Sequence, residues 1–203
     1  MAIVALIYPT FARMTATEAT RLLRTRRSIF PATYTDRPIE RAVLEEILEN
    51  ANYAPTHRLT EPWRFKVFRG AGKDVLEQQL VANYAVVTPA EKRSPKKVDK
   101  MRAKLDRSAA VIAICMQRDP EARVPEWEEI AATAMAVQNL WLGCHAHGIG
   151  CYWSSPAAAL HGGPAFRLRE GERCLGLLYL GYHELPELPA KRTPMADKLT
   201  WVE

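Results

Sequence analysis

The spacing of apolar residues near the start of the chain predicts an amphipathic helix. Ala19 and Leu22 lie three residues apart, as do neighbours on one face of a helix. Thr15 followed by Glu18 forms a capping-box pattern, in which both side chains satisfy backbone N–H groups at a helix start. We therefore predict a helix over residues 16–26, which ends in a group of arginines.

The same spacing predicts two more helices. One runs from Pro38 to Asn52, and the longest runs from Pro125 to His147, where Gly148 is a natural stop. The apolar positions of the first are Val43, Leu44, Ile47, Leu48 and Ala51, and those of the second are Trp127, Ile130, Ala134, Met135, Val137, Trp141 and Leu142. Because the second is apolar over much of its circumference, we expect it to be buried, in the core or between subunits.

Four segments have the patterns of strands. Residues 63–68 alternate apolar and polar side chains, which is typical of a half-buried strand. Residues 109–116 form an apolar run, which indicates a strand buried on both faces. Two short strands, 149–153 and 173–181, are predicted to flank a helical segment broken at 162–164.

The remaining segments are predicted to be mostly irregular. A short helix is expected around 74–81, followed by a proline-containing loop over 83–98, and the proline-rich last twenty residues are expected to lie extended on another part of the structure. A single domain is expected over 14–203. Residues 1–13 are expected to be a dispensable extension, with Met14 a candidate start, and the alternative is an added strand that packs on the domain.

Composition places the chain among ordinary globular proteins. Its 203 residues are 48% hydrophobic and 25% charged, which disfavours overall disorder. The net charge is +5, and the excess of basic residues is concentrated in residues 21–27 and 91–107. A basic balance favours anionic ligands or nucleic acid as binding partners. The second segment mixes both signs of charge and has no aromatic residue for stacking on bases, so no nucleic-acid partner is predicted.

Cysteine usage and the N-terminus bear on location. The cysteines stand singly in apolar stretches without a CxxC pair, which favours reduced thiols in a cytoplasmic protein; they are Cys115, Cys144, Cys151 and Cys174. The apolar start at residues 2–8 is too short to span a bilayer and is followed by Pro9, so neither a signal peptide nor a membrane partner is predicted.

A metal site is not predicted from the cysteines and histidines. His145 and His147 lie between Cys144 and Cys151 in the sequence, which invites a metal interpretation. Adjacent helical positions point away from each other, and no carboxylate or second cysteine completes a ligand set.

Three short motifs carry the candidate chemistry. Arg26, Arg27 and Ser28 supply two guanidinium groups and a hydroxyl, which suit a phosphate dianion. The alternative for this motif is that cations simply stabilise the last turn of a helix. Residues 54–65 form a polar turn that contains His57 and Glu61 and leads into a strand. This turn is a candidate ligand-binding segment, and the alternative is an ordinary surface turn whose polar groups bond only to the backbone.

The third motif follows a glycine turn. Trp153, Ser154 and Ser155 come after Gly148 and Gly150, where missing side chains would let the backbone approach a planar ring closely. The alternative is that Ser155 caps a helix that opens at Pro156, and both roles can hold together because they use different atoms.

Together the motifs resemble the FMN-dependent nitroreductase family. The matching segments are RRS at 26–28, APTHRLTEPWRF at 54–65 and IGCYWSS at 149–155, and the similarity continues through CLGLLYLGY at 174–182 and KRTPMADKLTW at 191–201. This resemblance implies an α+β fold with a mainly antiparallel central sheet flanked by helices. It also implies an intertwined homodimer in which an extended C-terminal tail embraces the partner and the flavin lies between subunits.

The resemblance also assigns roles to residues. It implies that Lys191 and Arg192 complete the phosphate site, that His57 and Glu61 line the flavin ring of the partner subunit, and that residues 153–155 contact the ring near N5. The implied activity is ping-pong reduction of nitroaromatic, quinone-like or related small-molecule acceptors, with FMN as cofactor and NAD(P)H as co-substrate. The isoalloxazine performs the hydride chemistry, so no side chain is assigned as catalytic.

Two positions depart from the family pattern. Phe30 stands where many relatives have a lysine near the flavin's pyrimidine edge, and Glu61 stands where relatives have glutamine. Both changes place less positive charge beside a ring that becomes anionic on reduction, so the redox potential of the flavin and the substrate range are expected to differ from those of such relatives. One alternative in the same fold is a flavin-sequestering protein with little turnover, and a further one is a basic nucleic-acid-binding protein.

Overall fold

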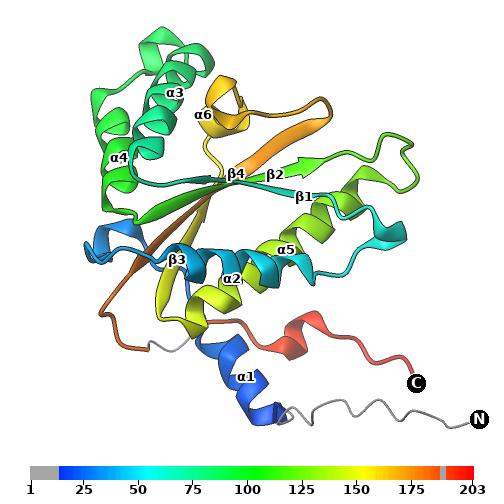
Figure 1. The fold of residues 1–203 in the computed structure, drawn as a ribbon. Coiled ribbons are helices and arrows are strands. Elements are labelled where there is room, and N and C mark those ends of the chain that lie inside the picture. Colours follow the sequence, from blue (N-terminus) through cyan, green and yellow to red (C-terminus); the bar gives the residue numbers. More distant parts are fainter. Residues whose placement is uncertain (1–13, 188–190) are drawn as a thin grey trace, which may run out of the picture.

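A four-stranded antiparallel sheet organises the chain in a computed structural model, which describes residues 14–187 and 191–203 (Figure 1). The spatial order is β1-β2-β4-β3, and every neighbouring pair is antiparallel. The strands are β1 (Trp63–Phe68), β2 (Ala110–Gln117), β3 (Ile149–Ser154) and β4 (Glu172–Tyr182). The predicted α+β fold with an antiparallel sheet is therefore confirmed.

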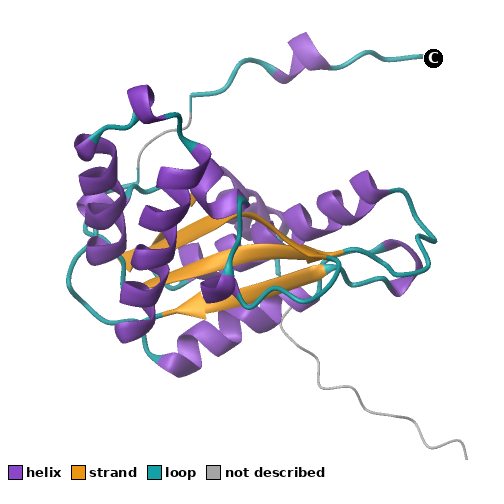
Figure 2. Ribbon diagram, turned by 90° about the horizontal axis from the view of Figure 1, so that it is seen from above, coloured by secondary structure: helices purple, strands orange, loops and turns teal. Residues whose placement is uncertain are grey.

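Helices cover both faces of the sheet, so the molecule has three layers (Figures 1 and 2). One face is covered by α3, α4 and α6, and the other by α2 and α5, with α1 beside the end of α5. The helices are α1 (Ala16–Thr25), α2 (Arg41–Asn52), α3 (Ala71–Val87), α4 (Pro95–Arg107), α5 (Glu126–Ala146) and α6 (Ala157–Leu160).

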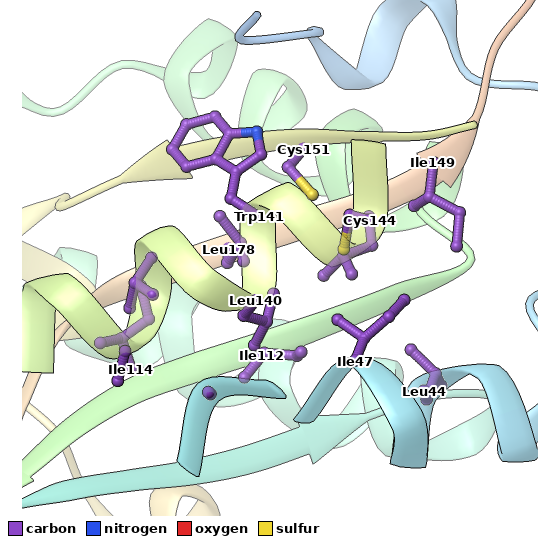
Figure 3. Packing of buried hydrophobic residues seen from close by; sticks show 14 of the residues in the cluster. Leu44, Ile47, Ile112, Ile114, Leu140, Trp141, Cys144, Ile149, Cys151 and Leu178 are labelled. Carbon is purple, nitrogen blue, oxygen red and sulfur yellow. The ribbon is translucent and has the colours of Figure 1, made fainter. Parts of the chain in front are cut away.

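The core consists of two apolar clusters, one on each face of the sheet. Strand β2 supplies both, because Ile112 and Ile114 face α5 while Val111 and Ala113 face α3 and α4. Figure 3 shows the first cluster between α2, α5 and the sheet. Since burial of one large aliphatic side chain contributes about 1.5–3 kcal/mol, the central strands hold the layers together.

Most predicted elements are confirmed with small changes of boundary. The capping box of Thr15 and Glu18 is formed, all four strands are present, and α5 ends before Gly148, which has a φ of 70°. The segment between β3 and β4 contains only the short α6 and a 3-10 turn, Pro164–Phe166.

Three predicted boundaries are wrong. The second helix begins at Arg41 and not at Pro38, because Glu40 is extended and Ile39 before it lies in the core. The short helix expected at 74–81 is the 17-residue α3. The loop predicted over 83–98 is instead the end of α3, a 3-10 turn and the start of α4, since Pro95 occupies the first helical position, where proline is tolerated.

The buried face of α5 also differs from the predicted stripe. Trp127 is 67% exposed and Met135 39% exposed, whereas the polar Glu129 and Thr133 are buried. The buried positions are Glu129, Ala132, Thr133, Ala136, Val137, Leu140, Trp141 and Cys144. The single chain therefore covers one face of α5 and leaves large apolar side chains on the other.

An ion pair fixes the loop between β2 and α5. Glu129 is 1% exposed, and its carboxylate pairs with the Arg118 guanidinium and also accepts a hydrogen bond from the backbone N–H of Asp119 at 2.8 Å. Arg118 further donates to the carbonyl of Val124 at 2.7 Å. Because a buried carboxylate is strongly destabilising without its partner, this cluster holds the start of α5 against the sheet.

We predict that Arg118→Met lowers the free energy of unfolding by about 3 kcal/mol, because it leaves the Glu129 carboxylate buried without a cation. Urea unfolding of the wild type and the variant measures this. Arg102→Met is the matched control, since Arg102 pairs with Glu77 at the surface and should change stability by less than about 1 kcal/mol. Equal losses in the two variants would contradict a special role for the buried pair.

Candidate functional site

The segment after α1 is attached to the outer edge of β3. The Ile29 N–H donates to the Cys151 carbonyl at 2.9 Å, and Ser28 and Cys151 form an isolated parallel bridge. Farther along, the Tyr34 hydroxyl lies 2.8 Å from the Ile29 carbonyl oxygen and 2.9 Å from that of Tyr179. These contacts fix where the arginines that end α1 lie relative to the sheet.

Close packing at this junction requires glycine. A Cβ at Gly150 would lie 2.8 Å from the Cβ of Ile29 and 2.9 Å from a ring carbon of His183. A Cβ at Gly181 would lie 2.5 Å from the ring of Tyr34. Since real side chains do not approach so closely, the two glycines allow the segment to lie flat on the strands.

A cavity of about 380 Å³ opens beside this junction. It lies between the end of α1, the last turns of α5 and the chain that leaves β4. Its lining consists of Thr25, Arg27, Ser28, Ile29, Phe30, Thr33, Trp141, His145, Ile149, His183, Leu185, Pro186 and Glu187. The structure thus places two of the three residues of the predicted phosphate motif in the wall of one cavity.

Three buried N–H donors around this cavity have no hydrogen-bond partner in the part of the chain that the structure describes. They are Nε of Arg26, Nε of Arg27 and Nε1 of Trp141. The Arg26 guanidinium lies over the Trp141 ring, 4.6 Å from its centroid. Buried donors in folded proteins are nearly always paired with a protein group, an ordered water or a ligand.

The two arginines at the cavity, Arg27 in its wall and Arg26 beside it, fit an anion, and the wall also contains the carboxylate of Glu187. Burial and the nearby cations Arg192 and Arg27 lower the pKa of the Arg26 guanidinium below its usual value. Arg27 is held in place by bonds of 2.6 Å from its Nη1 to the carbonyl oxygens of Arg24 and Arg26. A cluster of like charges is unfavourable alone and becomes favourable beside a phosphate, whose oxygens accept several N–H bonds.

Two further residues of the cavity were not predicted as site residues. Trp141 supplies a buried donor, and His145 Nε2 lies 2.8 Å from the Thr25 hydroxyl, with its pKa lowered by burial. The sequence contains no signal that could connect them with Arg26, because they lie more than a hundred residues away on α5.

Lys191 and Arg192 lie in the exposed C-terminal tail, and only Arg192 is close enough to influence Arg26.

The residues predicted after the glycine turn lie at the outer edge of the sheet. Trp153 and Ser154 end β3, and Ser155 is exposed just beyond it. Because Cys151 directs its carbonyl outward to Ile29, alternation along the strand directs the backbone groups of Trp153 to the same outer side. The alternative role of Ser155 as a helix cap is not observed, since Pro156 is the N-cap of α6 and no side chain caps it.

His57 and Glu61 lie elsewhere on the same chain. The His57 ring pairs with Glu128 at the start of α5 at 2.7 Å, and both His57 and Glu61 are exposed. The turn has backbone strain, because Arg58, Leu59 and Glu61 have φ values of 52°, 52° and 40°. Neither His57 nor Glu61 lines the cavity near Arg27, so a single chain does not bring the three motifs together.

Neither a metal cluster nor a membrane span is found in the described ranges 14–187 and 191–203. No group of three or more His, Cys, Asp or Glu side chains there could hold a metal ion. No helix in these ranges combines the length and apolar character needed to cross a bilayer. The four cysteines are free and buried.

Comparisons with known proteins connect this arrangement to one family. A model described as the Nitroreductase family matches residues 23–182. The Bacillus subtilis (strain 168) protein named "Putative NAD(P)H nitroreductase YfhC" is 34% identical over 187 residues, which are 88% of this chain and 91% of that protein. An Escherichia coli (strain K12) protein with the same form of name is 31% identical over 150 residues, which are 70% of this chain and 76% of that protein.

Solved structures agree with these relatives. The nitroreductase-like family protein from Bacillus cereus has a TM-score of 0.79 and 30% identity, covering 95% of this chain and 100% of that chain. The FMN-dependent nitroreductase from Mycobacterium smegmatis, solved in complex with NADPH, has a TM-score of 0.71 and 16% identity, covering 93% and 99%. At this lower identity the second structure supports the fold alone.

We predict that Gly150→Ala lowers the free energy of unfolding by about 2 kcal/mol, because the added methyl group overlaps Ile29 and His183. Gly72→Ala is the matched control. A Cβ there has no atom within 4 Å and lies in α3, so this variant should be unchanged or slightly more stable. Urea unfolding measures both variants, and a Gly150→Ala protein as stable as the wild type would show that the junction is looser than described.

Proposed function

Since the chain belongs to the Nitroreductase family, we propose that it is an FMN-dependent oxidoreductase that uses NAD(P)H to reduce nitroaromatic, quinone-like or related acceptors by a ping-pong mechanism. Its relatives in Bacillus subtilis and Escherichia coli both carry the name "Putative NAD(P)H nitroreductase", and the Mycobacterium smegmatis protein of similar fold is an FMN-dependent nitroreductase solved with NADPH. A cytoplasmic location is part of the proposal, which the four free cysteines support.

The single observation that carries the proposal is the set of buried, unpartnered donors beside the cavity. Arg27 lines the cavity and Arg26 lies beside it over Trp141, and the Nε donors of both are buried without a partner among the described residues. The one carboxylate in the cavity wall, that of Glu187, pairs with Arg21. A phosphate monoester such as that of FMN provides the missing acceptors and the opposite charge. The residues present therefore fit the phosphate end of this cofactor.

The remaining site residues are proposed to position the ring. FMN, when bound, supplies the hydride chemistry of both half-reactions. Lys191 and Arg192 would add positive charge to the phosphate end. The outer edge of β3 at Trp153 and Ser154, with Ser155 beyond it, would present backbone donors and acceptors to the edge of the ring.

A homodimer is proposed because a single chain separates the motifs. The exposed apolar side chains of Trp127 and Met135 on α5 offer a surface for a second copy, as does Trp201 in the tail, which is 79% exposed. A partner packed on α5 would bring its own turn, with His57 and Glu61, toward the ring held by the first chain. Small-molecule acceptors would then enter between the two subunits.

We predict that the apoprotein binds FMN and that NADPH or NADH rapidly bleaches the bound flavin under anaerobic conditions. Arg26→Ala and Arg27→Ala should each weaken FMN binding about ten- to a hundredfold, because each removes a charge-assisted bond worth roughly 1.5–3 kcal/mol. Fluorescence titration of apoprotein with FMN measures the affinity, and stopped-flow absorbance measures the reduction.

Arg24→Ala is the matched control, since Arg24 is an exposed arginine of α1 and, unlike Arg26 and Arg27, has no buried unpartnered donor among the described residues. Wild-type affinity in both Arg26→Ala and Arg27→Ala would refute the phosphate assignment. A protein that binds FMN but is not reduced by either nicotinamide cofactor would instead be a flavin-sequestering protein.

Glu61→Gln is predicted to raise the midpoint potential of the bound flavin by about 20–30 mV. The Glu61 carboxylate, supplied by the partner subunit, would oppose the negative charge that reduction places on the ring, and about 30 mV corresponds to 1.4 kcal/mol for two electrons. Potentiometric titration of both proteins checks this, with light scattering to establish that both are dimers. An unchanged or lowered midpoint would remove Glu61 from the flavin site.

A further inference from the structure

His145 is an ionisable residue in the wall of the cavity at the arginine cluster. It lies in the last turn of α5 and lines the same cavity as Arg27. Trp141, one helical turn earlier, lies under the Arg26 guanidinium, so both α5 residues are on the side of the helix that faces the arginines. An imidazole can change its charge near neutral pH, whereas a guanidinium cannot. His145 can therefore make the charge of this cavity depend on pH.

A hydrogen bond determines which ring nitrogen of His145 takes up a proton. The Thr25 hydroxyl donates its only proton to the carbonyl oxygen of Arg21 at 2.9 Å. The same hydroxyl oxygen lies 2.8 Å from Nε2 of His145, so it accepts there, and we assign the proton of the neutral ring to Nε2. Nδ1 then carries a lone pair in the neutral ring and becomes a donor only when the ring is charged.

The charges around His145 favour the neutral ring in the isolated chain. Burial lowers the pKa of the His145 imidazole below its usual value. Arg26, His183 and Arg27 lower this pKa further, whereas Glu187 acts in the opposite direction. A phosphate dianion bound at the arginines would outweigh their charge and favour the imidazolium. The negative end of the α5 macrodipole favours it as well, because His145 lies in the last turn.

We propose that His145 is a further phosphate ligand of the FMN site and that FMN binding is coupled to the uptake of a proton at its Nδ1 atom. The proton comes from solvent and stays on the ring while the phosphate is bound. The charged ring then donates from Nδ1 to the phosphate and from Nε2 to the Thr25 hydroxyl. This inference rests on the proposed function, because it takes FMN as the ligand.

The coupling has a definite sign. The complex holds more protons than the free protein and free FMN, so the affinity rises as the pH falls. The rise begins at the pKa of His145 in the complex and ends at its lower pKa in the free protein. The phosphate of FMN has its own ionisation near pH 6, which opposes this trend in every variant alike. The contribution of His145 is therefore the difference between the wild type and a variant that lacks the imidazole.

The other histidines are less suited to this role. His183 also lines the cavity, but its Nδ1 accepts the backbone N–H of Leu185 at 3.2 Å, and protonation there would break that bond. His57 and His147 each pair with a carboxylate, and neither lines the cavity. His161 is exposed and lies outside the cavity wall. Proton uptake is therefore assigned to His145.

The first test measures the proton directly. Calorimetric titration of the flavin-free protein at pH 7, in buffers of different ionisation enthalpy, gives the number of protons taken up per ligand bound. We expect about half a proton for FMN and none for riboflavin, which has the same ring without the phosphate. His145→Gln keeps an amide that can donate to Thr25 and cannot be charged, so it should abolish the uptake. His147→Gln, in the same part of the chain but outside the cavity, is the matched control and should keep it.

Two further variants separate titration from packing. Thr25→Val removes the acceptor that fixes the tautomer, so the neutral ring can place its proton on Nδ1 and donate without being charged. Proton uptake should then fall to less than about half of the wild-type value, while Thr25→Ser should retain it. His183→Asn keeps an acceptor for Leu185. Loss of uptake in His183→Asn and not in His145→Gln would assign the proton to the other histidine and overturn the inference.

The second test is the pH profile of the affinity. Between pH 8 and pH 6, the FMN affinity of the wild type should rise about fivefold relative to that of His145→Gln, because a shift of one pKa unit corresponds to a tenfold change. Fluorescence titration measures both proteins. Parallel profiles, or equal proton uptake in the two proteins, would overturn the inference while leaving FMN as the cofactor.

Absence of FMN binding would refute the proposed function instead. Titration with inorganic phosphate would then decide the role of His145. Phosphate binding with a proton uptake that His145→Gln abolishes would support the inference for the anion site alone. Phosphate binding without that uptake, or no binding, would overturn it.

Discussion

The backbone hydrogen bond from Ile29 to Cys151 is the constraint on which the candidate site depends. It joins a segment near the start of the chain to a strand more than a hundred residues later. The bond places the end of α1 at the outer edge of the sheet, and the Tyr34 hydroxyl and the missing side chains of Gly150 and Gly181 keep it there. Without this junction, Arg26 and Arg27 would project from a surface helix, where they would be hydrated and weak as ligands.

The junction also explains why the arginine cluster is tolerated. Burial of Arg26 beside Arg27 and near Arg192 is unfavourable in the isolated chain, and the lowered pKa of Arg26 reflects that cost. Stacking on Trp141 offsets part of it. Such clusters occur where stability is given up for function, and the core clusters on the two faces of the sheet supply the compensating burial.

The sequence predicts elements well where local patterns decide them. The capping box at Thr15, the alternation of β1 and the apolar run of β2 are local features, and each element forms where expected. The loop predicted over 83–98 failed because a proline can begin a helix as well as end one, and Pro95 begins α4.

Site prediction is limited by contacts that are distant in sequence. The motif at Arg26, Arg27 and Ser28 could be identified from its residue types, and two of its members line the cavity. Trp141 and His145 could not, because only the packing of α5 against α1 brings them there. The sequence likewise could not predict that His57 and Glu61 lie away from this cavity, because their positions depend on which end of α5 each motif contacts.

The length of α5 has an evolutionary consequence. Glu128, which holds the turn at His57, and Trp141, beside Arg26, lie thirteen residues apart on this one helix, or about 20 Å along its axis. The exposed Met135 lies near the midpoint, so a two-fold axis there would place each turn beside the other copy's arginines. A single inserted or deleted residue would rotate one end by about 100° and misalign both sites at once. Homologues should therefore tolerate substitutions in α5 far more readily than changes in its length.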